Sequence, residues 1–247
     1  MTSVADIMFK GYLYCSSSPN GQEIQELARI EGCNPGGKYL DRETGQRYYV
    51  KVNSSELHTR LEHFANLVYG LLDIPSATSH LLWLQGADSP HLAIASKMVH
   101  GYLHSTPAPL RNHQDIINGF VADCWLRNPD AVGEYYDNII FSPDGHAYRI
   151  DNGCVGPFSA TGKPREFLGD TIPELDSVRI SSRAEGQVFG LVTEAQMKVQ
   201  AAHLLRMLNE TSIIDILEES GISAKETATL SRIWVGRLCS LRSRFVL

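Results

Sequence analysis

The sequence predicts an α+β protein of two lobes, with a β-rich front lobe and a mainly helical back lobe. Residues 38–52 and 79–99 contain aromatic and β-branched runs around turn-forming residues, which is typical of β-hairpins. Residues 56–72 instead place apolar side chains at helical spacing. In the last third of the chain, capping sequences open long helical patterns.

Composition narrows the function classes. The chain has 247 residues, is 43% hydrophobic and carries a net charge of −6, so no overall basic field suggests a nucleic-acid partner. No apolar run approaches the roughly 18 residues that a membrane-spanning helix needs. The first residues lack the pattern of a secretory signal. Five cysteines are scattered without metal-ligand spacing, which indicates reduced thiols rather than a zinc site.

The front lobe is expected to span residues 1–100. Its first 30 residues are ambiguous, and "GQEIQELARI" is interpreted as a short helix after a turn. A hairpin with its turn at Glu43–Gly45 follows, and then the helix of residues 56–72, which Pro75 stops. Two strands around a Gly-Ala-Asp-Ser-Pro turn complete the lobe.

The back lobe is expected to span residues 101–247. Residues 100–112 have the composition of a linker, and residues 113–127 form an apolar helical pattern. "NIIF" and "AYRI" then predict a hairpin closed by the tight turn "SPDG". Two capping boxes, Thr193 with Gln196 and Ser223 with Glu226, open the helices of the last third.

The hairpin carries a candidate metal site. Asn138 begins its first strand and Asp151 ends its second, so antiparallel pairing brings the two side chains together. Amide and carboxylate oxygens suit Mg²⁺, which binds a few protein oxygens together with phosphates and water. The alternative is a surface hairpin with Asx-type turns at both ends.

Three segments of the front lobe favour the metal site. "GCNPGGKYLD" (32–41) is a Gly-rich turn of the kind that lets backbone N–H groups approach phosphates. Lys51 lies within an apolar strand and needs a partner if it points inward. Glu62, in the middle of the next helix, is the preferred partner, with Glu56 as its competitor.

These features resemble the protein-kinase plan. The segments "NPGGKYLDRETGQRYYVK", "RLEHFANLVYGLLDIPSA" and "FVADCWLRNPDAVGEYYDNIIFSPDGHAYRIDNG" resemble a divergent bacterial branch of the protein-kinase-like superfamily, nearest the HipA-type and phosphatidylinositol-kinase-like enzymes, which also includes effector kinases. The resemblance covers residues 30–155. It implies a two-lobed protein-kinase-like fold and an ATP- and Mg²⁺-dependent kinase acting on a protein hydroxyl of Ser or Thr, less readily Tyr.

The resemblance also assigns roles to residues. Lys51 would bind the α/β-phosphates and Glu62 would hold it. Asn138 and Asp151 would bind Mg²⁺, with "DNG" (151–153) standing where kinases have D-F-G. The nucleotide would further contact three residues of the Gly-rich turn and one of the hinge: Asn34, Gly36, Gly37 and Met98.

The catalytic base departs from the family pattern. Kinases place an Asp five residues before the metal-binding Asn, where this chain has Gly133. Asp130 is the preferred base, and Asp123 and Asp137 are its rivals. Asp123 lies within an apolar helix, and the alternative interpretation is that it is a buried structural carboxylate.

Regulation, location and substrate stay open. Because "DNG" lacks the Phe and no A-P-E follows, we expect constitutive activity or control by a partner or an anionic activator. The chain fits a cytoplasmic enzyme or an effector delivered into a host cell. Alternatives are a kinase-like pseudoenzyme that acts as a binding module, an AMP transferase, and a lipid or inositol kinase.

Overall fold

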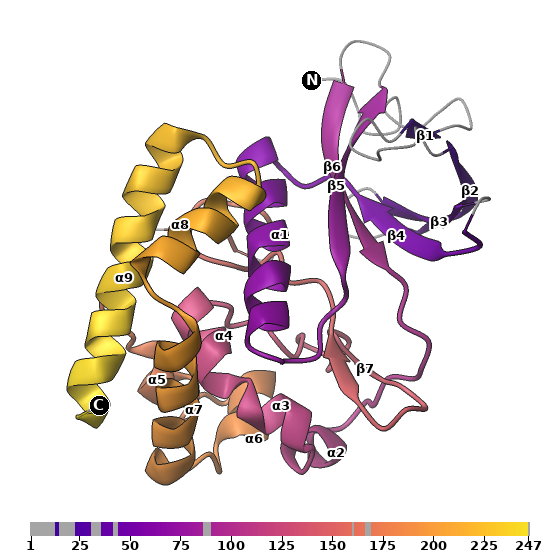
Figure 1. Cartoon of the computed structure of the whole chain (residues 1–247). Coiled ribbons are helices and arrows are strands. Elements are labelled where there is room, and N and C mark those ends of the chain that lie inside the picture. The colour runs from indigo at the N-terminus through magenta and orange to yellow at the C-terminus, as the bar shows by residue number, and fades with distance from the viewer. Residues whose placement is uncertain are drawn as a thin grey trace.

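The structure is a computed structural model that describes residues 13–14, 23–30, 36–41, 44–85, 90–159, 161–165 and 169–246. Within these residues, one sheet and one long helix form the front lobe, and helices with one small hairpin form the back lobe (Figure 1). The α+β plan expected from the sequence is therefore confirmed. No helix within the described residues is long and apolar enough to cross a membrane.

The front-lobe sheet is antiparallel, and its described strands follow the order β1-β2-β3-β4-β6-β5. Their bounds are β1 (Leu13–Tyr14), β2 (Glu23–Ile30), β3 (Gly36–Asp41), β4 (Arg47–Lys51), β5 (Ser79–Gln85) and β6 (Pro90–Lys97). The short helix expected at the end of the first 30 residues is wrong, because that segment is β2. Pairing with β3 outweighs the local helical preference of its Glu, Leu and Ala residues.

The predicted front-lobe helix is confirmed as α1 (Glu56–Leu71). Ser55 caps it by accepting a hydrogen bond from the backbone N–H of His58, which satisfies one of the free donors of the first turn. One side of α1 packs on β5 and β6, and another contacts α8 of the back lobe (Figure 1). The helix therefore touches both lobes.

The back lobe contains helices of very different lengths: α2 (Pro107–Arg111), α3 (Gln114–Asn118), α4 (Phe120–Leu126), α5 (Glu174–Ser177), α6 (Ala184–Phe189), α7 (Glu194–Met207), α8 (Glu210–Glu219) and α9 (Ala224–Phe245). The expected linker contains α2, because Pro107 suits the first position of a helix. The single helix expected over 113–127 is divided at Gly119. A Cβ at Gly119 would lie 2.1 Å from Arg149 Nη2, so the glycine makes room for that side chain.

The predicted hairpin forms a separate two-stranded sheet of β7 (Ile139–Phe141) and β8 (Ala147–Arg149). Its turn closes through a hydrogen bond from Gly145 N–H to the Ser142 carbonyl (3.0 Å). Gly145 has a φ of 88°, which favours glycine. The hairpin therefore forms where the sequence predicts it, but its register is shifted by one residue from the expected pairing: Ile139 pairs with Arg149, so Asn138 lies across from Ile150 and Asp151 follows the end of β8.

The larger apolar core runs from α1 through the back lobe. Phe64 of α1 and Trp125 of α4 both contact the ring of Trp234 in α9. Arg237 of α9 is buried and donates hydrogen bonds to the carbonyls of Trp125 (2.9 Å) and Cys124 (2.7 Å). The long C-terminal helix thus supports the end of α4, from which the loop containing Asp130 begins.

Candidate active site

Lys51 lies at the centre of the site, at the end of β4. Its side chain is buried, and its Nζ lies 2.9 Å from Glu62 Oε1 and donates to the carboxylate of Asp151. Burial alone would lower the pKa of Lys51, but the two carboxylates outweigh burial and raise the pKa above its usual value. The ammonium is therefore charged and held at a fixed point.

Glu62 is the α1 carboxylate that partners Lys51. It is buried, and its other oxygen accepts a hydrogen bond from Asn53 Nδ2 (2.8 Å). Burial raises the pKa of Glu62 while the charge of Lys51 lowers it. Glu56 instead lies 3.7 Å from Arg60 on the exposed start of the helix. Of the two sequence candidates, Glu62 is the one that reaches Lys51.

Asp151 lies two residues after β8, at the opening of the site. Its side chain is 58% exposed even though it contacts Lys51, so its oxygens remain accessible to a cation. The positive charge of Lys51 lowers the pKa of Asp151 below its usual value. The residue has a φ of 52°, a strained backbone conformation outside glycine.

Asn138 immediately precedes β7 and lies beside the end of β8. Its carbonyl accepts a hydrogen bond from Ile150 N–H (2.9 Å), and its Nδ2 donates to the Asp130 carbonyl (2.8 Å). With the amide nitrogen used in this way, the amide oxygen of Asn138 is the atom left for a cation. One amide oxygen and one ionised carboxylate fit Mg²⁺, which prefers oxygen ligands.

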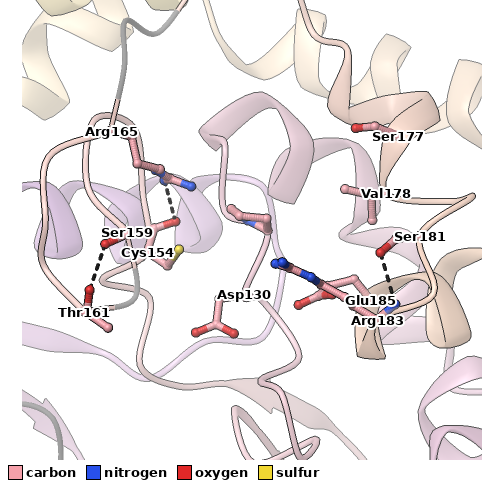
Figure 2. A pocket seen from close by; sticks show the side chains of 11 residues that line it. Asp130, Cys154, Ser159, Thr161, Arg165, Ser177, Val178, Ser181, Arg183 and Glu185 are labelled. Carbon is pink, nitrogen blue, oxygen red and sulfur yellow. Dashed lines mark hydrogen bonds between the residues drawn. The ribbon is translucent and has the colours of Figure 1, made fainter.

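Asp130 lines a cavity of ≈ 480 Å³ (Figure 2). The other walls include Ser159, Thr161, Arg183 and Glu185, and Figure 2 shows Asp130 between the first two of these residues and the last two. Burial, reinforced by the charge of Glu185, raises the pKa of Asp130 to about 6. A carboxylate with this pKa is ionised at neutral pH and accepts a proton more readily than an ordinary Asp.

The two rival aspartates lie in different surroundings. Asp123 is buried in α4, where it accepts hydrogen bonds from Arg149 Nε (2.9 Å) and Tyr69 Oη (2.8 Å). Asp137 is exposed. Asp123 thus belongs to a buried ion pair, in agreement with its structural interpretation, while Asp130 lines the cavity.

The residues expected to contact the nucleotide are only partly described. Asn34 lies outside the described residues. Gly36 and Gly37 belong to β3, where they pair with Lys51 and Val50 instead of forming the turn itself. A Cβ at Gly36 would lie 2.6 Å from Tyr49 Oη, so a side chain there would collide with that ring.

Met98 directly follows β6 at the junction of the lobes. Its N–H donates to the Arg47 carbonyl (2.9 Å), so this amide is already used within the protein. The backbone group of Met98 left to contact an adenine base is therefore its carbonyl oxygen, which would accept a hydrogen bond from the base.

Asn152, Asn66 and Asn128 form a buried chain of amides that sequence reasoning missed. Asn152 Nδ2 donates to Asn66 Oδ1 (2.8 Å) in α1, and Asn128 Nδ2 lies 3.5 Å from Asn152 Oδ1. The position of Asn152 in "DNG" and of Asn128 two residues before Asp130 was the available signal. This row of three asparagines connects the segments that carry Glu62, Asp151 and Asp130.

Arg165 was also missed. Its Nη2 donates to the carbonyls of Arg127 (3.0 Å), Cys154 (3.3 Å) and Gly156 (3.1 Å). These bonds tie the start of the Asp130 loop to the segment that follows Asp151. Nothing in the local sequence around Arg165 indicates these partners, which are distant along the chain.

Three solved structures to which this chain is similar are protein kinases. The proinflammatory kinase CtkA of Helicobacter pylori matches with a TM-score of 0.58 and 13% sequence identity, over 91% of this chain and 96% of that chain. A rhoptry kinase from Toxoplasma gondii matches with a TM-score of 0.36 and 11% identity, over 95% and 83% of the two chains. A MAP kinase from Leishmania major matches with a TM-score of 0.32 and 10% identity, over 90% and 68%.

No protein-family model matches the sequence, and no curated protein matches it. The first structural similarity nevertheless extends over nearly the whole of both chains. The chain therefore has a protein-kinase-like fold, with a small antiparallel sheet in one lobe and helices in the other.

Proposed function

We propose that the protein is an ATP- and Mg²⁺-dependent kinase that transfers the γ-phosphoryl group to a protein hydroxyl. The observation that carries the proposal is the ammonium of Lys51, buried between the carboxylates of Glu62 and Asp151. Burying the charged pair of Lys51 and Glu62 is costly unless its geometry serves a purpose, and a fixed ammonium beside the exposed carboxylate of Asp151 suits a polyphosphate.

Each residue would contribute positioning or charge. Lys51 would bind phosphate oxygens while Glu62 fixes its direction, and Asn138 with Asp151 would hold Mg²⁺. The bound ion would neutralise charge on the phosphates. Because Asn138 is hydrogen bonded to the backbone of Asp130, the metal ligand and the base keep a constant separation.

Asp130 would act on the acceptor. A bond forms between the acceptor oxygen and the γ-phosphorus, the bond from that phosphorus to the β–γ bridging oxygen breaks, and the hydroxyl proton passes to the Asp130 carboxylate. ADP leaves with the bridging oxygen. The raised pKa of Asp130 favours this proton transfer.

The proposal also includes the type of acceptor residue, the branch of the superfamily and the biological role. The cavity of ≈ 480 Å³ beside Asp130 has room for a side chain that carries a hydroxyl, and the resemblance to protein kinases is what favours Ser or Thr over Tyr. The proinflammatory kinase CtkA of Helicobacter pylori shares the fold, which supports a kinase-like activity; the HipA-type branch and a role as an effector in a host cell are carried as parts of the proposal. Control by a protein partner or an anionic activator belongs to the same proposal.

Labelled ATP tests the proposal directly. The protein is incubated with γ-labelled ATP, Mg²⁺ and a cell lysate as the source of acceptor proteins. We expect Asp130→Asn to lower the initial rate of protein labelling by about 10²–10⁴-fold, which is the usual contribution of a general base. Lys51→Ala and Asp151→Ala should abolish labelling, because each removes a group that binds the phosphates or the ion.

Asp137→Asn is the matched control, since it removes an exposed carboxylate from the same loop. Equal labelling by the wild type and Asp151→Ala would overturn the proposal. Incorporation of α-label instead of γ-label would identify an AMP transferase, and label found in lipid would identify a lipid kinase. Nucleotide binding without any transfer would identify a non-catalytic binding module.

A further inference from the structure

The first turn of α1 contacts the chain that follows Asp151. His58 Nε2 lies 2.8 Å from the carbonyl of Gly153, a hydrogen-bond distance, and the His58 ring stacks on Phe158 with centroids 4.6 Å apart. His58 is itself buried. The ring therefore uses both its edge and its face to hold the segment 153–158.

Ser54 extends this contact by one further point. It precedes α1, and its Oγ donates to the carbonyl of Gly162 (2.8 Å) while lying 3.1 Å from His58 Nδ1. The serine therefore lies between the imidazole and the far end of the segment, to which it is hydrogen bonded. Residues 153–159 and 161–162 are thus held at both ends by two side chains that are four positions apart.

The two glycines of this segment allow its close approach to α1. A Cβ at Gly153 would lie 3.2 Å from His58 Nε2 and 3.1 Å from Glu62 Oε2. A Cβ at Gly162 would lie 2.6 Å from Ser54 Oγ, and its φ of 72° also favours glycine. The close packing against α1 therefore explains why the third residue of "DNG" is a glycine.

We propose that His58 is a positioning residue, which holds residues 153–159 and 161–162 so that the cavity wall formed by Ser159 and Thr161, the acceptor wall, keeps a fixed relation to α1. His58 lies one helical turn before Glu62, so both side chains occupy the same side of α1. One residue holds Lys51, and the other holds the chain two positions after Asp151. This inference rests on the proposed kinase activity.

The contact has a consequence for the acceptor cavity. Ser159 and Thr161 line the same cavity as Asp130, and in the sequence they lie between Phe158 and Gly162. Phe158 stacks on His58 of α1, and the carbonyl of Gly162 accepts a hydrogen bond from Ser54, just before α1. Losing the contact therefore shifts the acceptor wall, while the Lys51–Glu62 pair that faces the phosphates keeps its own bond.

Two substitutions at His58 separate hydrogen bonding from packing. His58→Phe keeps a ring to stack on Phe158 but removes the donor to Gly153. His58→Gln keeps an N–H near the position of Nε2 but removes the ring. We expect His58→Phe to lower kcat/KM for the acceptor by about tenfold, the equivalent of one lost hydrogen bond, while the Kd for ATP changes less than about twofold.

The conservative variant provides the rescue. His58→Gln should recover kcat/KM to within about threefold of the wild type, because the hydrogen bond to Gly153 is worth more than the stacking. Equal losses in His58→Phe and His58→Gln, or equal activity in His58→Phe and the wild type, would overturn the inference. A loss that appears only as a raised Kd for ATP would also overturn it.

A second measurement needs no activity. Amide hydrogen exchange of the intact protein is followed at Ser159, Gly162 and Lys163, whose N–H groups bond within this segment. Ser54→Ala, a change at an exposed position, should speed their exchange by about three- to tenfold, with little change in the amides of α9. Unchanged exchange in both Ser54→Ala and His58→Phe would refute the positioning role even if the wild type shows no kinase activity.

Discussion

Three aspartates of the back lobe show how surroundings divide one residue type into different roles. Asp123 is buried against Arg149, and Asp137 is exposed. Asp130 lines a cavity, and the pKa of its carboxyl group is raised. Their order along the chain is no guide to these differences. The charges and the burial around each carboxylate decide whether it supports the fold, accepts a proton or faces solvent.

Removing the charge of Asp123 should destabilise the fold. Asp123→Asn leaves the fully buried guanidinium of Arg149 without its counter-charge, which costs about 3–5 kcal/mol in the free energy of unfolding. Urea denaturation of the purified protein measures this difference. Asp137→Asn is the control and should stay within about 0.5 kcal/mol of the wild type; similar losses in both variants would contradict the structural role of Asp123.

At the scale of elements, α1 connects the parts of the candidate site. Its successive turns carry three polar side chains. His58 contacts Gly153, Glu62 contacts Lys51, and Asn66 accepts a hydrogen bond from Asn152. Between them, His63 faces β5, with its Nδ1 2.8 Å from Ser79 Oγ. A helix with this many buried polar side chains is held by specific partners as well as by its apolar side.

His63 should make the stability of the protein depend on pH. Burial, with a smaller contribution from the charge of His80, lowers the pKa of His63 from 6.5 to about 4. Between these values the unfolded chain binds more protons than the folded one, so stability falls as the pH falls. We expect His63 to contribute a loss of about 2 kcal/mol between pH 7 and pH 5, by linkage.

The free energy of unfolding of the wild type and of His63→Gln, measured in urea at pH 7 and pH 5, tests this contribution. The amide introduced by His63→Gln does not titrate, so the loss on acidification should be smaller in the variant by about 2 kcal/mol. His146→Gln, the same substitution at an exposed position, is the comparison variant. Identical pH dependence in the wild type and His63→Gln would contradict the prediction.

At the scale of the whole molecule, the site is built from both lobes. Lys51 and Glu62 come from the front lobe, whereas Asn138 and Asp151 flank the hairpin of the back lobe (Figure 1). The contact between Lys51 and Asp151 joins the two lobes directly. A ligand that binds this set of groups would therefore add contacts across the junction.

Nucleotide should accordingly stabilise the entire protein. At an ATP concentration about 100 times its Kd, with Mg²⁺ in excess, we expect a gain of about 2.7 kcal/mol, seen as a rise in Tm. EDTA should remove most of the gain, because in the proposed site the ion would link the phosphates to Asn138 and Asp151. Asp151→Ala should show the same loss without EDTA, and a Tm shift in that variant equal to the wild type would contradict a shared phosphate and metal site.

The sequence by itself determined the α+β plan, the long front-lobe helix, the hairpin at Asn138–Asp151 and the pairing of Lys51 with Glu62. Each of these follows from local periodicity, turn residues or the need of a buried charge for a partner. It misassigned β2, because a short segment with mixed local preference becomes a strand by pairing with the strand that follows it.

Only the tertiary structure decided the rest. It showed that Asp123 is committed to Arg149, that Asp130 lines a cavity, and that His58 approaches Gly153 and Phe158. The contacts of Asp123 and His58 join residues 26 to 100 positions apart, and no local pattern encodes them. Burial and charge depend on which distant segments come together, so the role of a polar side chain is settled by packing and not by its neighbours in sequence.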